Sequence, residues 1–243
     1  VAVFSQADKC APYVTLADEA VYLGGSNVGE SYLVIEKLIA AAKSAGANAI
    51  HPGYGFLSEN ADFARACSDN NITFIGPSVE AIELMGCKRK AKIAMLAAGV
   101  PCIPGYEGSD QSDENLIEQA LIVGFPLMVK AAKGGGGRGM RLVNSEADLK
   151  TAIKSARSEA QNAFGSGELI IEKAISDARH IEIQIFADSF GKTIHLAERD
   201  CSVQRRHQKV IEEAPSMVLT DVARQKMGEA AILAAQACDY VGA

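Results

Sequence analysis

The stretch that decides how this sequence is interpreted is Lys130-Ala131-Ala132-Lys133-Gly134-Gly135-Gly136-Gly137-Arg138-Gly139-Met140. Its four consecutive glycines have no Cβ atoms, so this backbone can adopt positive φ angles and bring its N–H groups close to phosphate oxygens. Lys130 and Arg138 add a permanent positive charge on either side of the glycines. The pattern therefore predicts a loop that cradles phosphate groups.

The alternative is a flexible linker, which usually mixes glycine with serine between polar segments. Here the glycines instead join two apolar, strand-like runs, residues 125–129 and 140–143. The loop also differs from the two commonest nucleotide motifs, because the chain has no GxxxxGK[ST] sequence and no GxGxxG that opens a helix after the first strand. A glycine loop between two strands instead resembles the hairpin that folds over the nucleotide in the ATP-grasp fold.

The chain before this loop alternates strands with helices. The apolar spacing predicts helices over residues 31–45 and 59–69, and strands over residues 47–50 and 72–77. Ser78 then caps a helix that continues to Met85. Such an alternation is typical of an α/β fold with a doubly wound parallel sheet.

The remaining elements are expected on both sides of the glycine loop. A helix over residues 90–98 should end at Gly99, and a polar loop over residues 107–113 should precede a strand within residues 121–129. Beyond the loop, we expect a helix from Ser145, a strand over 169–173, strands over 181–186 and 193–198, and a helix over 221–238. Within the strand over 193–198, His195 should face solvent between buried neighbours.

These elements divide the chain into four expected parts: an N-terminal domain (residues 1–84), a helical linker (85–101), a compact α+β lid (102–174) and the start of a C-terminal subdomain (175–243). The first residues read as the inside of a strand and the last as the approach to another. We therefore expect both terminal parts to be truncated.

Bulk composition excludes several classes of protein. The 243 residues are 48% hydrophobic and 22% charged, as in an ordinary globular protein, and the net charge of −6 argues against a nucleic-acid partner. No apolar run is long enough for a membrane span, and the first residues do not resemble a secretory signal. Six cysteines without a CxxC pair indicate reduced thiols in a cytoplasmic protein rather than disulfides or a zinc site.

A second polar stretch, residues 198–215, contains four cations and a histidine within eleven residues, bracketed by carboxylates. A solvated charge run would have this composition. An anion site would have it too, because glutamine and histidine alternate with the cations. On its own, the stretch leaves both interpretations open.

Four stretches together resemble the biotin carboxylase family of the ATP-grasp superfamily, in the same order and spacing and over essentially the whole chain. They are His51-Pro-Gly-Tyr-Gly-Phe-Leu-Ser-Glu-Asn60, the glycine loop, residues 178–184 and residues 198–215. Within the family, the chain resembles the subunits of methylcrotonyl- or geranyl-CoA carboxylases. The resemblance implies a partial doubly wound N-terminal (pre-ATP-grasp) domain, an ATP-grasp lid and the start of the C-terminal ATP-grasp domain.

The resemblance also implies an activity, that of a ligase. The parent protein would carboxylate biotin on a carrier domain with ATP and bicarbonate, through carboxyphosphate, as the first half-reaction of an acyl-CoA carboxylase. A carboxyltransferase component and a homo-oligomeric assembly are implied as well, with no nucleic acid and no membrane. Mg²⁺ would be held by carboxylates beyond Ala243, so no metal ligand is assigned here and the chain alone is expected to be inactive. Alternatives are pyruvate carboxylase, another ATP-grasp ligase, or a non-catalytic nucleotide-binding domain.

Individual roles follow from the same resemblance. The residues implied to contact ATP are Lys88 and Lys130 at the phosphates, Gly136 and Gly137 as backbone donors, Glu172, Lys173 and Ile175 at the adenine edge, His180 and Gln204 near the ribose and polyphosphate, and His207. Lys209 is implied to bind bicarbonate. A lysine suits these oxygens because it is a compact point charge, and two of them can neutralise charge that grows on a transferring phosphoryl group. Taken singly, Lys88 could be a surface lysine, and Glu172 could pair with Lys173 or another cation.

Overall fold

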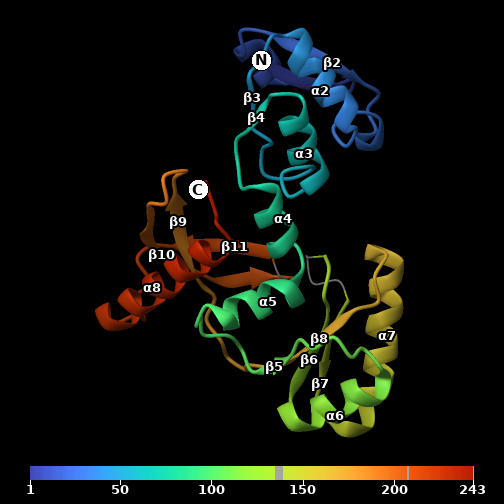
Figure 1. Ribbon diagram of the computed structural model, residues 1–243, viewed down its shortest axis with the longest axis vertical. Coiled ribbons are helices and arrows are strands. Elements are labelled where there is room, and N and C mark those ends of the chain that lie inside the picture. The colour runs from blue at the N-terminus through green and yellow to red at the C-terminus, as the bar shows by residue number, and fades with distance from the viewer. Residues whose placement is uncertain (135–138, 207, 243) are drawn as a thin grey trace. The chain divides into compact units, whose positions relative to one another are not determined.

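A computed structural model describes residues 1–134, 139–206 and 208–242 of the chain. The chain forms two compact units, Val1–Glu83 and Leu84–Val241 (Figure 1). Each unit has a hydrophobic core of its own.

The first unit contains two pairs of parallel strands. Strand β1 (Ala2–Ser5) pairs with β2 (Ala20–Gly24), and β3 (Ala49–Ile50) pairs with β4 (Thr73–Phe74). The helices are α1 (Pro12–Leu16), the 3-10 turn η1 (Val28–Glu30), α2 (Ile35–Ser44), α3 (Ala61–Asp69) and α4 (Val79–Met85), the last of which spans the boundary between the units. Parallel strands connected through helices confirm the α/β prediction.

The core of the first unit is centred on Phe63, which is 1% exposed and packs edge-on against Phe74 with ring centroids 5.9 Å apart. Helix α3 presents Phe63 because its start is fixed by Asn60, whose side-chain oxygen accepts the Phe63 N–H at 2.8 Å. This cap also explains why the helix begins slightly later than predicted.

The second unit begins with α5 (Lys88–Ala97), followed by a four-stranded antiparallel sheet. Its strand order is β5 (Gly105–Tyr106), β8 (Leu169–Lys173), β6 (Leu127–Ala131) and β7 (Met140–Val143). Helices α6 (Asp113–Val123) and α7 (Glu146–Phe164) pack on this sheet (Figure 1). Because β6 and β7 are consecutive and antiparallel, the glycine-rich segment joins the two strands of a hairpin, as predicted.

Strand β6 overlaps the strand expected within residues 121–129, but helix α6 was not predicted and begins at the end of the expected polar loop. Ser112 caps this helix by accepting the Asn115 N–H at 3.4 Å, and Leu116 and Ala120 lie one turn apart in the core. Gly124, with φ of 75°, ends it. The helix forms because a polar cap and apolar positions four residues apart outweigh the β-favouring valine and isoleucine near its end.

A three-stranded antiparallel sheet follows, with the order β11 (Gln208–Glu213), β10 (Thr193–Arg205) and β9 (Ile181–Ala187). The charged stretch is therefore a hairpin between β10 and β11 rather than an irregular run. Helix α8 (Asp221–Ala237) packs against β9 and β10, and Thr220 caps its start by accepting the Ala223 N–H at 3.2 Å.

His195 is placed differently from the expectation. Its neighbours Ile194 and Leu196 are 41% and 57% exposed, whereas His195 is half-buried and packs against Gly228 of α8. The pairing of β10 with β9 shifts register between His195 and Glu198, where Ala197 takes a φ of 64°. Helix α8 covers the face that carries the histidine, which simple alternation along the strand could not reveal.

All six cysteines are free thiols. Within the described ranges, no helix is both long enough and apolar enough to cross a bilayer.

Candidate functional site

Lys130 and Glu172 lie side by side at the base of the glycine hairpin. Lys130 is opposite Ile170 in the pairing of β6 with β8, so Glu172, two residues further along β8, lies on the same face of the sheet. The Lys130 Nζ is 2.5 Å from Glu172 Oε2, and the two side chains are 20% and 12% exposed. A cation at the foot of the loop is thus held by an internal carboxylate.

A second lysine, Lys92 of α5, reaches the other oxygen of the same carboxylate. Its Nζ lies 3.0 Å from Glu172 Oε1 and 3.7 Å from Glu107 Oε2, and its side chain is only 7% exposed. Burial alone would raise the pKa of Glu172, but the hydrogen bonds and charges of Lys130 and Lys92 outweigh it and hold that pKa below its ordinary value. Glu172 is therefore a carboxylate at neutral pH. Among the described residues, its ion-pair partners are Lys130 and Lys92 and not Lys173.

Lys88 is the first residue of α5, and its ammonium group donates to the carbonyl of Gly134 at the start of the glycine segment. Burial lowers the pKa of Lys88, and the positive charge of Lys130 lowers it further. Two cations from different elements therefore lie close enough to repel one another. An anion between them would relieve that repulsion, and the N-terminus of α5 adds a partial positive charge at the same place.

The residues flanking the undescribed part of the loop are well anchored. Gly134 and Gly139 have φ angles of 84° and 68°, which only glycine adopts without strain. The Gly139 N–H donates to Glu159 Oε1 of α7 at 3.0 Å. Gly136 and Gly137, the predicted backbone donors, lie outside the described residues.

The predicted adenine-edge residues lie at the end of β8. The Lys173 side chain donates to the carbonyls of Gly124 and Phe125, at 3.2 and 2.7 Å, so it closes the end of α6. Its own N–H donates to Pro104 O at 2.9 Å. Ile175 follows in the chain with a side chain that is largely exposed.

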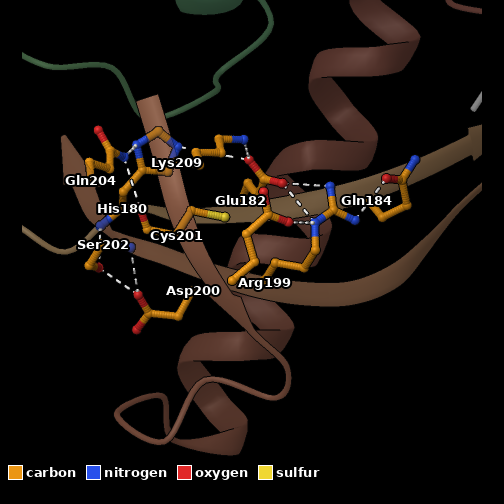
Figure 2. A network of polar contacts seen from close by, with 10 residues as sticks. His180, Glu182, Gln184, Arg199, Asp200, Cys201, Ser202, Gln204 and Lys209 are labelled. Atoms are coloured by element: carbon orange, nitrogen blue, oxygen red, sulfur yellow. Dashed lines mark hydrogen bonds and ion pairs between the residues drawn. The ribbon is translucent and has the colours of Figure 1, made fainter. Parts of the chain in front are cut away.

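A second polar cluster lies on the three-stranded sheet, with Glu182 at its centre between Arg199 and Lys209 (Figure 2). Arg199 Nη2 and Nε lie 2.5 and 2.7 Å from Glu182 Oε1, and the Lys209 ammonium group pairs with Oε2. Arg199 also lies 3.6 Å from Glu212 Oε2 and donates to Gln184 Oε1 at 3.1 Å. One carboxylate thus fixes cations from β10 and β11.

The charges of this cluster are stable at neutral pH. Burial would raise the pKa of Glu182, but the hydrogen bonds from Lys209 and Arg199 outweigh it and lower that pKa. The hydrogen bond to Glu182 raises the pKa of Lys209. Lys209 is therefore cationic at neutral pH, and an anion could bind its ammonium group beside Glu182.

His180 and Gln204 meet at the edge of the same cluster, with His180 Nδ1 3.0 Å from Gln204 Nε2 (Figure 2). Gln204 Nε2 also donates to the Cys201 carbonyl at 2.9 Å, and His180 Nε2 is 3.9 Å from Glu182 Oε2. His207, another predicted ATP contact, is not among the described residues.

Glu182, Cys201 and Glu212 place three possible ligand atoms within 4.8 Å of one another. They do not fit Mg²⁺, which takes oxygen ligands, because one of them is a thiol. Burial raises the pKa of that thiol, so Cys201 is neutral, and both oxygens of Glu182 already face cations. Lys209 and Arg199, rather than a metal ion, neutralise the charge of Glu182.

The predicted site residues that the structure describes therefore form two groups, one around Lys130 and one around Lys209. Within the described ranges, no hydrogen bond or ion pair joins the two. Sequence reasoning missed Lys92, Glu182 and Arg199. A signal for Lys92 existed, because it follows Lys88 by four residues and so shares its face of the helix.

The His51–Asn60 stretch belongs to the first unit, where His51, Pro52 and Leu57 help to line a cavity of about 280 Å³. Among the described residues, no Lys, Arg, Asp or Glu side chain lines it. Its lining is mostly apolar, apart from Tyr32 and His51, and no described lysine or arginine there offers phosphate groups a counter-charge.

An antiparallel sheet with a glycine-rich hairpin, followed by a second antiparallel sheet with a basic hairpin, is the arrangement of the ATP-grasp class. Comparison with known families agrees: "Carbamoyl-phosphate synthase L chain, ATP binding domain" matches residues 87–243, and "Biotin carboxylase, N-terminal domain" matches residues 1–82. The chain belongs to the biotin carboxylase family.

Individual relatives are similar throughout the chain. It is 53% identical to the methylcrotonoyl-CoA carboxylase subunit alpha of Dictyostelium discoideum and 54% identical to a Nostoc biotin carboxylase, with all of this chain covered. It spans 35% and 54% of those proteins. A crystal structure described as a biotin carboxylase–beta-gamma-ATP complex from Campylobacter jejuni matches with a TM-score of 0.95 and 53% identity, over 99% of this chain and 54% of that one.

Proposed function

We propose that this chain binds ATP through Lys88 and Lys130 and forms the nucleotide-binding part of a biotin carboxylase. The observation that carries the proposal is the convergence of these two lysines at the start of the glycine segment. Lys88 contacts Gly134 there, and the charge of Lys130 lowers the pKa of Lys88. A polyphosphate supplies the negative charge that this arrangement favours. The Campylobacter jejuni complex with an ATP ligand supports the same assignment.

The remaining nucleotide contacts stay proposals. Glu172, Lys173 and Ile175 would offer main-chain groups to the adenine edge. The N–H of Lys173 already donates to the Pro104 carbonyl. We therefore assign the Lys173 carbonyl and the Ile175 N–H to the adenine edge. His180 and Gln204 would bind nearer the ribose and polyphosphate. We also propose Gly136 and Gly137 as backbone donors to ATP and His207 as a further ATP contact.

For the second substrate, we assign Lys209 to bicarbonate. A raised pKa keeps Lys209 cationic, and Glu182 holds its ammonium group in place. Attack of the bicarbonate oxygen on the γ-phosphorus of ATP would give carboxyphosphate and ADP, and carboxyphosphate would then carboxylate biotin on a carrier domain. Mg²⁺ would shield the phosphate charge. Its ligands would not come from Glu182, Cys201 and Glu212.

The parent protein would work with a biotinyl carrier and a carboxyltransferase, as a homo-oligomer. Similarity does not indicate which acyl-CoA the parent protein would carboxylate, because the chain is 53% identical to a methylcrotonoyl-CoA carboxylase subunit and 54% identical to a biotin carboxylase. Free thiols favour a reducing compartment such as the cytoplasm. The division of the second unit at residues 101 and 174 also remains a proposal.

Isothermal titration of the chain with MgATP and with adenosine tests the proposal. We expect Lys130→Met and Lys88→Met to weaken MgATP binding by roughly tenfold or more and to leave adenosine binding unchanged, because each removes a charge-assisted contact to phosphate. Lys90→Met is the matched control, since Lys90 is exposed on the same helix as Lys88. No binding of MgATP, or an equal loss in the control, would overturn the assignment.

A further inference from the structure

Lys92 is an unusual residue because its ammonium group is almost completely buried. It lies on α5, one turn after Lys88, and only 7% of its side chain is exposed. A buried ammonium group is unfavourable unless carboxylates compensate it. An apolar residue could fill the same space without this cost. The role of the Lys92 charge must therefore be found in its contacts.

Those contacts form a line of alternating charges. Glu107 Oε2 is 3.7 Å from Lys92 Nζ, and it accepts no hydrogen bond among the described residues. Lys92 Nζ is 3.0 Å from Glu172 Oε1, and Glu172 Oε2 is 2.5 Å from Lys130 Nζ. Lys92 is thus connected through one carboxylate to the cation at the foot of the glycine loop.

The backbone leaves room for this arrangement at Gly105 of β5. A Cβ atom at that position would lie 2.9 Å from Lys92 Nζ and 2.1 Å from the carbonyl oxygen of Ile171. Only glycine therefore allows Lys92 to approach Glu172 while β5 stays paired with β8.

We propose that Lys92 is a positioning residue that, by sharing the Glu172 carboxylate, leaves Lys130 free to turn from Glu172 to the phosphates of a nucleotide. This inference rests on the proposed ATP binding and deepens it. When a nucleotide arrives, its phosphates must compete with the Glu172 carboxylate for the Lys130 ammonium group. Because Lys92 binds the other oxygen of that carboxylate, Glu172 holds Lys130 in place less tightly and can release it. Without Lys92, Lys130 is the one described cation that forms an ion pair with Glu172, and Glu172 retains it.

The test is a double-mutant cycle on the full 243-residue chain, with MgATP and adenosine as probes. We expect Lys92→Met to weaken MgATP binding by roughly tenfold, the effect of one charge–charge contact at a partly buried site, and to leave adenosine binding unchanged. The double variant Lys92→Met with Glu172→Gln should regain most of the MgATP affinity, because the competing carboxylate is gone. Lys90→Met, on the exposed face of the helix, should have no effect.

A structural role alone predicts a different pattern. If Lys92 merely stabilised the unit, the double variant would be at least as weak as Lys92→Met, and adenosine binding would fall in parallel. Either result overturns the proposal, as does unchanged MgATP affinity in Lys92→Met.

A second readout separates this inference from the proposed function. Hydrogen exchange of the Lys130 ammonium group, followed by NMR on the chain without nucleotide, should slow in Lys92→Met because Glu172 then pairs with Lys130 alone. If the wild-type chain bound no ATP, the proposed function would fail, and this exchange rate would still show whether the three side chains are coupled. An unchanged exchange rate contradicts the coupling.

Discussion

Replacing Glu182 by glutamine should loosen the three-stranded sheet, because this carboxylate joins Arg199 of β10 to Lys209 of β11. Glutamine keeps an oxygen that can accept from Arg199, but it loses the charge and the ion pair with Lys209. Hydrogen bonds to charged groups contribute about 1.5–3 kcal/mol each. The Arg199 and Lys209 side chains are 39% and 37% exposed, so solvent screens both pairs. We therefore expect a loss of about 2 kcal/mol, which is less than the roughly 3 kcal/mol that two unscreened contacts would contribute at the low end.

Amide hydrogen exchange of residues 181–213 measures this loss locally, which matters because a chain of two compact units need not unfold in one step. A loss of about 2 kcal/mol corresponds to exchange roughly 30-fold faster in β9 and β10. Glu213→Gln is the matched control, since it makes the same charge change at an exposed position of the same sheet.

The pH dependence of the effect has a defined sign. The pKa of Glu182 in the folded chain lies below its ordinary value of 4.5, so its stabilising contribution is present above pH 4.5 and is lost as the pH falls through the folded pKa. The exchange difference between wild type and Glu182→Gln should therefore be constant from pH 7 to 5 and shrink on further acidification. Equal protection in the two proteins at pH 7, or a difference that grows in acid, refutes the reasoning.

Two further substitutions test the packing of each unit. Phe63→Ala should destabilise the first unit by about 3–5 kcal/mol, because it removes a ring that is 1% exposed, and urea denaturation followed by circular dichroism would show a transition at lower urea. Gly105→Ala should destabilise the second unit by about 1–3 kcal/mol, because its Cβ would lie 2.1 Å from a strand carbonyl that cannot move away, and a thermal melt that matches wild type would contradict this packing.

The sequence predicted the parts of the fold that depend on local pattern. Alternating strands and helices indicated the parallel pairs of the first unit, and apolar runs on both sides of the glycines indicated the β6–β7 hairpin. Helix α6 was missed although Ser112, Leu116 and Ala120 carry its cap and its apolar spacing. The β10–β11 hairpin was missed because all six residues of β11 are exposed, the apolar ones included, so the strand lacks the usual alternation of apolar and polar residues.

The site was predictable only in part for a related reason. Family resemblance pointed to Lys88, Lys130 and Glu172, but not to the contacts between them. Lys92 and Glu172 are 80 residues apart in the sequence, and no local pattern indicates that a folded sheet brings a buried lysine to that carboxylate. Burial and ion pairing of this kind depend on tertiary packing, so only the structure revealed them.

The most direct test of the account is the reactivity of individual lysines towards an amine-modifying reagent, read by mass spectrometry with and without MgATP. The lowered pKa of Lys88 leaves more of its amine neutral, so it should react readily in the free chain. The account predicts that MgATP protects Lys88 and Lys130 while the exposed Lys90 and Lys133 stay reactive. Saturating MgATP that leaves Lys88 and Lys130 as reactive as before would contradict it.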